Sequence, residues 1–306
     1  TDSGNISVGG LATVVSGGNA ITLGDATTAN FGSIDFAGST VAITEASIMS
    51  LAASEATGAL SLTASGAITQ TGAIDADGTS SISAGTNAIT LDAANDFTGA
   101  VSVSNTGAND VSITDSNALD LGTVDIGRDL TVTTGGALTD SAVVSVPGLA
   151  KIVATGQSVN LGDTTSANFG SLDFAGAAVT ITEDSSMAIA ASEATGALSL
   201  TANGAITQTG AIDADGTSSF SAGAHTITLT QANDFTGAVS LSNTGANDIS
   251  ITDSNALILG TVGVGRNLTV TTTGGALTDN ANIAVEGLAT IVATGQSVTL
   301  GDAVGE

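Results

Sequence analysis

The sequence predicts an all-β protein, a parallel β-solenoid, with three short strands in each rung of about 23 residues and about 13 rungs. Three observations lead to this fold class: a long repeat, a shorter repeat inside it, and runs in which apolar and polar residues alternate. Alternation with a period of two is typical of strands with one buried face. A short unit that cannot bury its apolar face alone gains a core when copies of it stack.

The long repeat has a period of about 138 residues and marks the chain as a tandem array. The segment GAITQTGAIDADGTSS at 66–81 recurs unchanged at 204–219, and ANDFTGAVS at 94–102 recurs at 232–240. One additional Thr, near Thr273, moves the third copy one position further along the chain. The sequence copies therefore span 1–138, 139–277 and 278–306, the last of them partial, and we expect one continuous solenoid over 1–306.

The shorter repeat is marked by Ile-Thr and related pairs that follow one another every ~21 to 26 residues. A second strand, as in GALSLTA and GAVSVSN, precedes each pair by roughly eight residues, and a third, shorter strand lies earlier in the unit. Gly, Asn, Asp and Ser between the strands favour tight turns. An array of immunoglobulin-like sandwiches is the alternative, but sandwich strands do not share a motif at such a spacing. The predicted core columns include Ile21, Ile43, Ile68, Ile89 and Ile113, with the Thr residues facing outward.

Composition limits the possible partners. The chain carries 29 acidic residues against three basic ones, a net charge of -26, and no cysteine. Nucleic-acid binding depends on Lys and Arg, so no nucleic-acid partner is expected, and an anionic lipid surface is disfavoured for the same reason. No run of 18 apolar residues is present, so no membrane-spanning helix is expected.

The repeats GALSLTASGAITQTG and GAVSVSNTGANDVSITDSNAL resemble those of large filamentous-haemagglutinin-type and related β-strand-repeat proteins of bacterial surfaces. The resemblance extends over the whole chain. It implies a right-handed parallel β-helix and an exported adhesin, stalk or fibre. The implied location is extracellular or on the cell surface.

Calcium is the metal that the sequence suggests. The residue after the Ile-Thr pair is Asp in two neighbouring units of each copy, which predicts one Asp stacked above another. At the strand spacing of ~4.8 Å two carboxylates repel each other, and a hard cation with oxygen ligands relieves that repulsion. In the alternative, both side chains point into solvent and are screened by salt. The candidate calcium ligands are Asp115, Asp140, Asp253 and Asp279, and no other cofactor is expected.

Two further chemistries are disfavoured. A β-helix enzyme acting on polysaccharides needs clustered carboxylates, basic groups and aromatic platforms, whereas His225 stands alone and Trp and Tyr are absent. We therefore expect no enzymatic activity. An ice-binding face would need a regular outward ladder, but the expected outward column is mixed and charged. This column comprises Thr13, Asp35, Ser61, Ser81, Ser102, Thr131, Lys151 and Asp173.

A verbatim repeat suits a function that scales with length or valency. The sequence therefore predicts a structural shaft segment of an extracellular bacterial filament, and a polyvalent adhesin for glycans or another cell is the alternative. The opening TDSGNISVGG matches the later TDSAVVSVPG, so we expect a window of a longer repetitive polypeptide. Neither end has a polar cap in its sequence, and unpaired strand edges favour end-to-end self-association.

Overall fold

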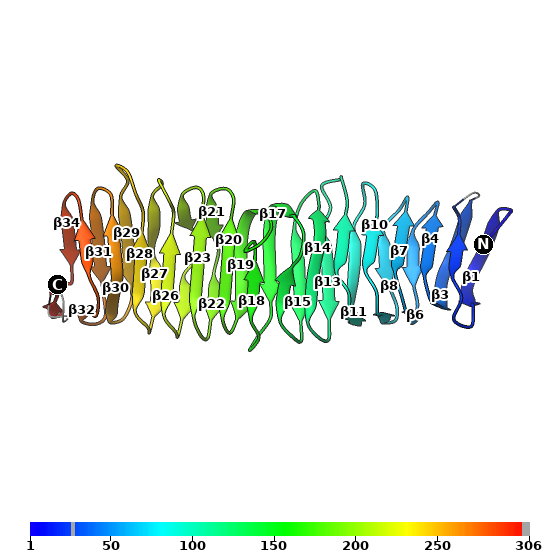
Figure 1. The fold of residues 1–306 in the computed structure, drawn as a ribbon, viewed down its shortest axis with the longest axis horizontal. Coiled ribbons are helices and arrows are strands. Elements are labelled where there is room, and N and C mark those ends of the chain that lie inside the picture. Colours follow the sequence, from blue (N-terminus) through cyan, green and yellow to red (C-terminus); the bar gives the residue numbers. More distant parts are fainter. Residues whose placement is uncertain (26–27, 302–306) are drawn as a thin grey trace. The chain divides into compact units, whose positions relative to one another are not determined.

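The computed structural model describes residues 1–25 and 28–301, and in these residues it contains 35 strands and no helix. The strands stack in parallel as a β-solenoid of about 15 turns, which confirms the predicted fold class (Figure 1). The chain divides into two compact units, Thr1–Val153 and Ala154–Glu306. The expectation of one continuous domain over 1–306 stays a prediction.

The first unit contains seventeen strands. They are β1 Ile6–Val15, β2 Ile21–Leu23, β3 Ala29–Gly38, β4 Val41–Glu45, β5 Met49–Leu51, β6 Ser54–Ala56, β7 Leu60–Ala64, β8 Ile68–Gln70, β9 Ile74–Ala76, β10 Ser80–Ser83, β11 Ile89–Phe97, β12 Val101–Ser104, β13 Val111–Asp115, β14 Leu119–Asp125, β15 Leu130–Thr134, β16 Leu138–Asp140 and β17 Val144–Val153.

The second unit repeats most of this order. Its described strands are β18 Val159–Leu161, β19 Ala167–Gly176, β20 Val179–Glu183, β21 Met187–Ile189, β22 Ser192–Ala194, β23 Leu198–Ala202, β24 Ile206–Gln208, β25 Ile212–Ala214, β26 Ser218–Ser221, β27 Ile227–Phe235, β28 Val239–Ser242, β29 Ile249–Asp253, β30 Leu257–Val264, β31 Leu268–Thr272, β32 Leu277–Asp279, β33 Ile283–Val285, β34 Ala289–Val292 and β35 Val298–Thr299.

The predicted rung of about 23 residues is too long, because the pairing register returns to the same column after about 20 residues. One column of residues paired in register can be followed through five steps in the first unit. This series is Ile21, Val41, Leu60, Ser80, Val101 and Leu121. One sequence copy therefore corresponds to about seven rungs rather than six, and the chain to about 15 rather than 13.

The spacing of the Ile-Thr pairs gave the wrong rung length because these pairs are not structurally equivalent. Ile43 is the second inward residue of β4 and pairs with Leu23 and Leu62, whereas Ile68 is the first residue of β8 and pairs with Met49 and Ile89. The same dipeptide thus lies on different sides of the coil. The three strands in a rung are as predicted, for example β7, β8 and β9.

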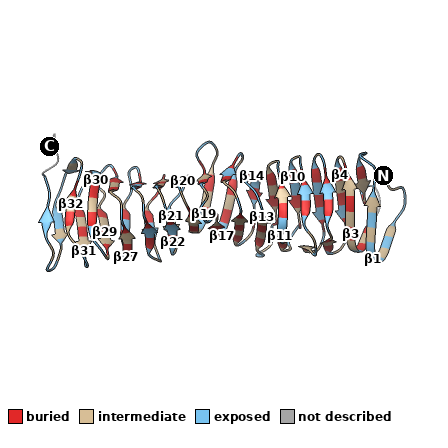
Figure 2. Ribbon diagram, turned by 90° about the horizontal axis from the view of Figure 1, so that it is seen from below, coloured by how far each residue is buried: buried red, intermediate tan, exposed pale blue. Residues whose placement is uncertain are grey.

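The predicted core residues are buried. All five Ile residues named from the sequence have exposed fractions of 4% or less, and the residues that pair directly with them are apolar. Burial of one such side chain contributes about 1.5–3 kcal/mol to the stability of the fold. In Figure 2, buried and exposed positions alternate along the inner strands, as the period of two requires.

Two glycines close equivalent turns in the two units. Gly24 and Gly162 have positive φ angles of 73° and 72°. A Cβ atom at either position would lie 2.0 Å from the carbonyl oxygen of Thr44 or Thr182. These turns therefore require glycine both for the backbone angle and for the close approach of the next rung. No helix of the described chain is long and apolar enough to cross a membrane.

Candidate functional site

The structure does not stack the four candidate calcium ligands upon each other. Asp115 pairs in register with Asn95 and Thr134, and Asp140 pairs with Leu121. In the second unit, Asp253 and Asp279 repeat these placements opposite Thr272 and Leu259. The predicted pairing of Asp over Asp is therefore wrong, because it assumed that one rung separates Asp115 from Asp140. Within residues 1–25 and 28–301 no group of three or more Asp, Glu or His side chains could hold a metal ion, and calcium binding stays a prediction.

Asp115 belongs instead to a set of four buried carboxylates, one at the end of each equivalent strand. Its Oδ2 accepts a hydrogen bond from the backbone N–H of Phe97 at 3.0 Å, and its Oδ1 accepts one from Asn117 N–H at 2.9 Å. Glu45 repeats the arrangement, because its Oε1 accepts the N–H of Phe31 at 2.9 Å. The full set is Glu45, Asp115, Glu183 and Asp253.

These carboxyl groups are difficult to ionise. Burial raises the pKa of Glu183 to about 7 and that of Asp253 to about 6, and it also raises the pKa values of Glu45 and Asp115. The backbone N–H groups counteract part of this effect. In the described chain, one carboxylate oxygen each of Glu45, Glu183 and Asp253 has no hydrogen-bond partner. The sequence analysis found the two Asp residues of this set but missed Glu45 and Glu183, although all four follow an Ile-Thr pair.

A buried amide side chain forms hydrogen bonds with three neighbouring rungs in each unit. Asn95 Oδ1 accepts the N–H of Ile74 at 2.9 Å, and Asn95 Nδ2 donates to the carbonyl oxygens of Leu91 and Thr114 at 3.1 and 2.9 Å. Gln70 Nε2 adds a hydrogen bond of 2.6 Å to Asn95 Oδ1. Asn233 makes the same contacts in the second unit. The repeated ANDF segment was the only sequence signal of this network.

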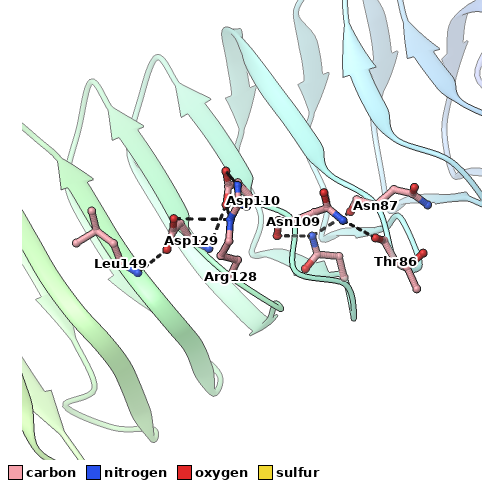
Figure 3. A network of polar contacts seen from close by, with 8 residues as sticks. Thr86, Asn87, Asn109, Asp110, Arg128, Asp129 and Leu149 are labelled. Atoms are coloured by element: carbon pink, nitrogen blue, oxygen red, sulfur yellow. Dashed lines mark hydrogen bonds and ion pairs between the residues drawn. The ribbon is translucent and has the colours of Figure 1, made fainter.

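Two of the three basic residues line a groove of about 480 Å³ in the first unit. Arg128 forms a bidentate ion pair with Asp110, and Asp129 accepts the backbone N–H of Leu149 at 2.7 Å, so polar contacts run from rung to rung along this edge (Figure 3). The Arg128 guanidinium lowers the pKa of Asp110. Lys151 also lines the groove, together with the hydroxyl-bearing residues Thr90, Ser112 and Thr131.

The second copy retains the ion pair but not the other charges of this groove. Arg266 pairs with Asp248, whose pKa this contact lowers to about 2. At the positions equivalent to Asp92, Asp129 and Lys151, the second copy has Thr230, Asn267 and Thr290. The groove of the first unit is therefore chemically distinct from the corresponding surface of the second.

An acidic ladder that the sequence analysis did not identify follows one outward column in each unit. Glu55, Asp75 and Asp96 pair in register on three consecutive rungs, and the second unit repeats them as Glu193, Asp213 and Asp234. Burial, followed by the charges of Asp234, Asp215 and Glu193, raises the pKa of Asp213. The three carboxylates therefore repel one another across the rungs.

The expected outward column of mixed residues is not a single column. Ser61, Ser81 and Ser102 pair with one another on β7, β10 and β12. Thr131 and Lys151 belong to a different column with Thr90 and Ser112. Consequently, the column through Ser61 carries no charge over these rungs, unlike the prediction.

The described chain is thus a β-solenoid repeat protein whose buried polar contacts recur in its two sequence copies. A family model of repeats of unknown function, DUF5649, matches residues 38–104, 108–173, 176–242 and 246–305. The chain belongs to this family. No curated protein and no solved structure matches it.

The family repeat is half of the long sequence period and corresponds to about three and a half rungs. Its matched segments begin at positions 38, 108, 176 and 246. Val41 and Val111, which begin the equivalent strands VAITE and VSITD of two successive family repeats, lie in different columns. Val41 pairs with Ile21 and Leu60, whereas Val111 pairs with Ile89 and Leu130. The equivalent strands of these two successive family repeats are therefore not stacked in one column.

Proposed function

We propose that this chain is a structural shaft segment of an extracellular bacterial filament or surface fibre, without catalytic activity. The observation that carries the proposal is that both copies use the same buried polar residues to join neighbouring rungs. Asn95 and Asn233 make matching hydrogen bonds to three rungs. The four buried carboxylates likewise accept hydrogen bonds from backbone N–H groups of the preceding turn. A chain whose repeated polar residues connect rungs gains length with each copy. The resemblance to bacterial surface fibres supports the same function.

Self-association end to end is part of this proposal. The first and last described rungs leave apolar side chains exposed, whereas the equivalent Leu149 and Val153 of an inner rung are partly buried. Leu11 and Val15 on β1 are 56% and 67% exposed, and Leu288 and Val292 near β34 are 67% and 42% exposed. Within the described residues each of these strands pairs with a single neighbour, so its other edge can accept a further strand.

The test uses this chain in sedimentation and negative-stain imaging. We expect a population of lengthening rods whose proportion rises with protein concentration. Leu288→Asp with Val292→Asp should shift this population toward single chains, because charge on a terminal strand opposes strand addition. The control variant, Thr195→Asp with Thr217→Asp, adds the same charge at exposed turns of inner rungs and should not change the rods. Compact globules, or equal effects of both variants, would refute the fibre proposal.

A polyvalent adhesin is the second candidate, and the groove at Arg128 is the observation that favours it. Its hydroxyl groups, carboxylates, Arg128 and Lys151 offer both donors and acceptors to a polyhydroxylated ligand such as a glycan. Asp92→Thr, Asp129→Asn and Lys151→Thr remove the three charges that this groove carries and that the second copy lacks. Loss of glycan or cell binding in this variant, with unchanged filaments, would favour the adhesin.

A further inference from the structure

Asn203 is followed by Gly204, and no other asparagine of the chain is followed by glycine. The two residues form the bend between β23 and β24, and the side chain of Asn203 is exposed. An asparagine side chain can close a five-membered ring with the backbone nitrogen of the next residue. Glycine hinders this closure least because it has no Cβ atom. The bend at Asn203 is therefore the place in the chain where this reaction meets the least steric resistance.

The packing of the bend requires glycine after Asn203. A Cβ atom at Gly204 would lie 2.5 Å from Ser186 Oγ and 2.7 Å from the backbone nitrogen of Ser186. A larger residue would therefore push the bend away from the preceding rung. The first copy has the same bend with Ser65 before Gly66, and within the segment LSLTANGAITQTG this is the one difference between the copies. Asn203 is thus held in front of the residue type that allows the ring to close.

The backbone nitrogen that would close the ring is free in the second copy. Within the described chain, the N–H of Gly204 donates no hydrogen bond, whereas the equivalent N–H of Gly66 donates to the carbonyl oxygen of Ser47 at 2.9 Å. A bound N–H must first break its hydrogen bond before the nitrogen can attack. The two copies therefore differ in the readiness of this nitrogen to react.

The side chain of Asn203 is only weakly held. Its Nδ2 donates to Asp184 Oδ1 at 3.4 Å, a long hydrogen bond between two exposed side chains. The backbone N–H of Asn203 donates to the carbonyl oxygen of Glu183 at 2.9 Å and keeps the bend in place. The amide group can therefore leave Asp184 and turn toward the nitrogen of Gly204 while the rung stays folded.

We propose that the folded chain modifies itself at Asn203, which is converted through a cyclic imide to aspartate and isoaspartate. The nitrogen of Gly204 bonds to Asn203 Cγ and gives its proton to water. The bond from Cγ to Nδ2 breaks, and Nδ2 takes up a proton and leaves as ammonia. Water then adds to one of the two ring carbonyls and opens the ring, to aspartate at Cγ or to isoaspartate at the backbone carbonyl. Water is the only co-reactant of the sequence of steps.

The modification changes the second copy and leaves the first as it is, whether or not the chain forms fibres. Either product places a carboxylate next to Asp184, and the two like charges repel each other. Isoaspartate also lengthens the main chain by one carbon–carbon bond of about 1.5 Å. Since β23 and β24 pair in register with the rungs on both sides, an added atom between them strains that register. The bend at Asn203 is therefore a point at which the chain weakens with age.

Mass spectrometry of the stored protein tests the proposal. The protein is kept folded near pH 8, samples are digested with pepsin at low pH, and the peptide that contains Asn203 is analysed over time. We expect the mass increase of an exchange of NH2 for OH, with isoaspartate identified by electron-transfer fragmentation. A second sample is stored in urea. Conversion in urea without conversion of the folded protein would overturn the proposal.

Ser65→Asn is the matched variant, because it creates the same sequence before a glycine whose N–H is hydrogen-bonded. We expect the new asparagine to react about fivefold more slowly than Asn203 of the same molecule, the factor that corresponds to one hydrogen bond of about 1 kcal/mol. Equal rates at the two bends would overturn the role of the free nitrogen.

Asn203→Ser gives the second copy the bend of the first. Stored samples of this variant should show no mass change in this peptide and should keep their melting temperature, whereas the melting temperature of the stored wild type should fall. An equal fall in both proteins would show that the modification does not weaken the chain and would overturn that part of the inference.

Discussion

The carboxyl group of Glu183 is completely buried at the end of β20, and burial raises its pKa from 4.5 to about 7. A raised folded-state pKa means that the protonated form stabilises the fold. This contribution is complete below about pH 4.5 and is lost as the pH rises through about 7. The shift corresponds to about 3 kcal/mol of stability between the two limits. Glu183 therefore contributes more to the stability of the fold in mild acid than at neutral pH.

We predict that Glu183→Gln removes this pH dependence. The amide stays neutral, so thermal unfolding of the variant should match the wild type near pH 4.5 and occur at higher temperature near pH 8. Glu286→Gln is the control, because Glu286 is exposed just beyond β33. Circular dichroism melts of the three proteins between pH 4 and 8 provide the measurement. Identical pH profiles of the wild type and Glu183→Gln would contradict the prediction.

At the scale of one element, Gly162 shows how a turn fixes the position of the next rung. Gly162→Ala should destabilise the chain more than Gly156→Ala does. Both glycines have positive φ angles, 72° and 75°, so each substitution carries a backbone cost of about 1–2 kcal/mol. Only at Gly162 would the new Cβ lie 2.0 Å from a carbonyl oxygen, whereas nothing lies within 4 Å at Gly156. Urea denaturation compares the two, and equal losses would argue against the close packing of this turn.

The acidic ladder on β22, β25 and β27 should oppose folding at low ionic strength. Asp213 is the middle carboxylate of the three, so Asp213→Asn removes both neighbouring repulsions. We expect the variant to melt at a higher temperature than the wild type in low salt, and the difference to shrink toward zero in about 1 M salt, where screening is strong. Glu286→Gln, at an exposed position outside the ladder, again serves as the control. A gain that persists undiminished in high salt would show that repulsion is not its cause.

At the scale of the whole molecule, the register between rungs makes the effects of deletions predictable. Removal of 60–79 joins Ala59 to Ser80, which pairs with Leu60 in register, so the remaining rungs can close. Removal of 60–82 places Ser83 in the inward position of Leu60. An odd shift turns each buried side chain of the strand outward.

We therefore expect the shorter deletion, of one whole rung, to lower the melting temperature by only a few degrees and to leave the β-sheet signal intact. The longer deletion should abolish cooperative unfolding. Thermal melts followed by circular dichroism distinguish these outcomes. If the longer deletion is tolerated better than the shorter one, the rung length predicted from the sequence spacing is correct and the pairing register is wrong.

The candidate site was only partly predictable. Asp115 and Asp253 were singled out because they follow Ile-Thr pairs, and they do occupy special positions. Their partners, however, are the backbone N–H groups of Phe97 and Phe235, which no residue pattern marks. Glu45 and Glu183 were not singled out, because the pairs before and after them in the sequence are followed by the uncharged residues Leu and Gln, which gave no stack of acidic residues. The burial of all four depends on how the preceding turn folds over them.

The sequence by itself determined the fold class, the inward Ile residues and the long sequence period. Alternation and repetition are local properties of the chain, and any parallel stack of such strands buries the same residues. Only the tertiary structure decided the rung length and which outward residues share a column. A strand such as β4 has three inward positions, so an Ile-Thr pair at Ile21 and another at Ile43 fit the same pattern while lying in different columns. Register is set by the turns and by hydrogen bonds between rungs, and these contacts join residues that lie a whole rung apart in the sequence.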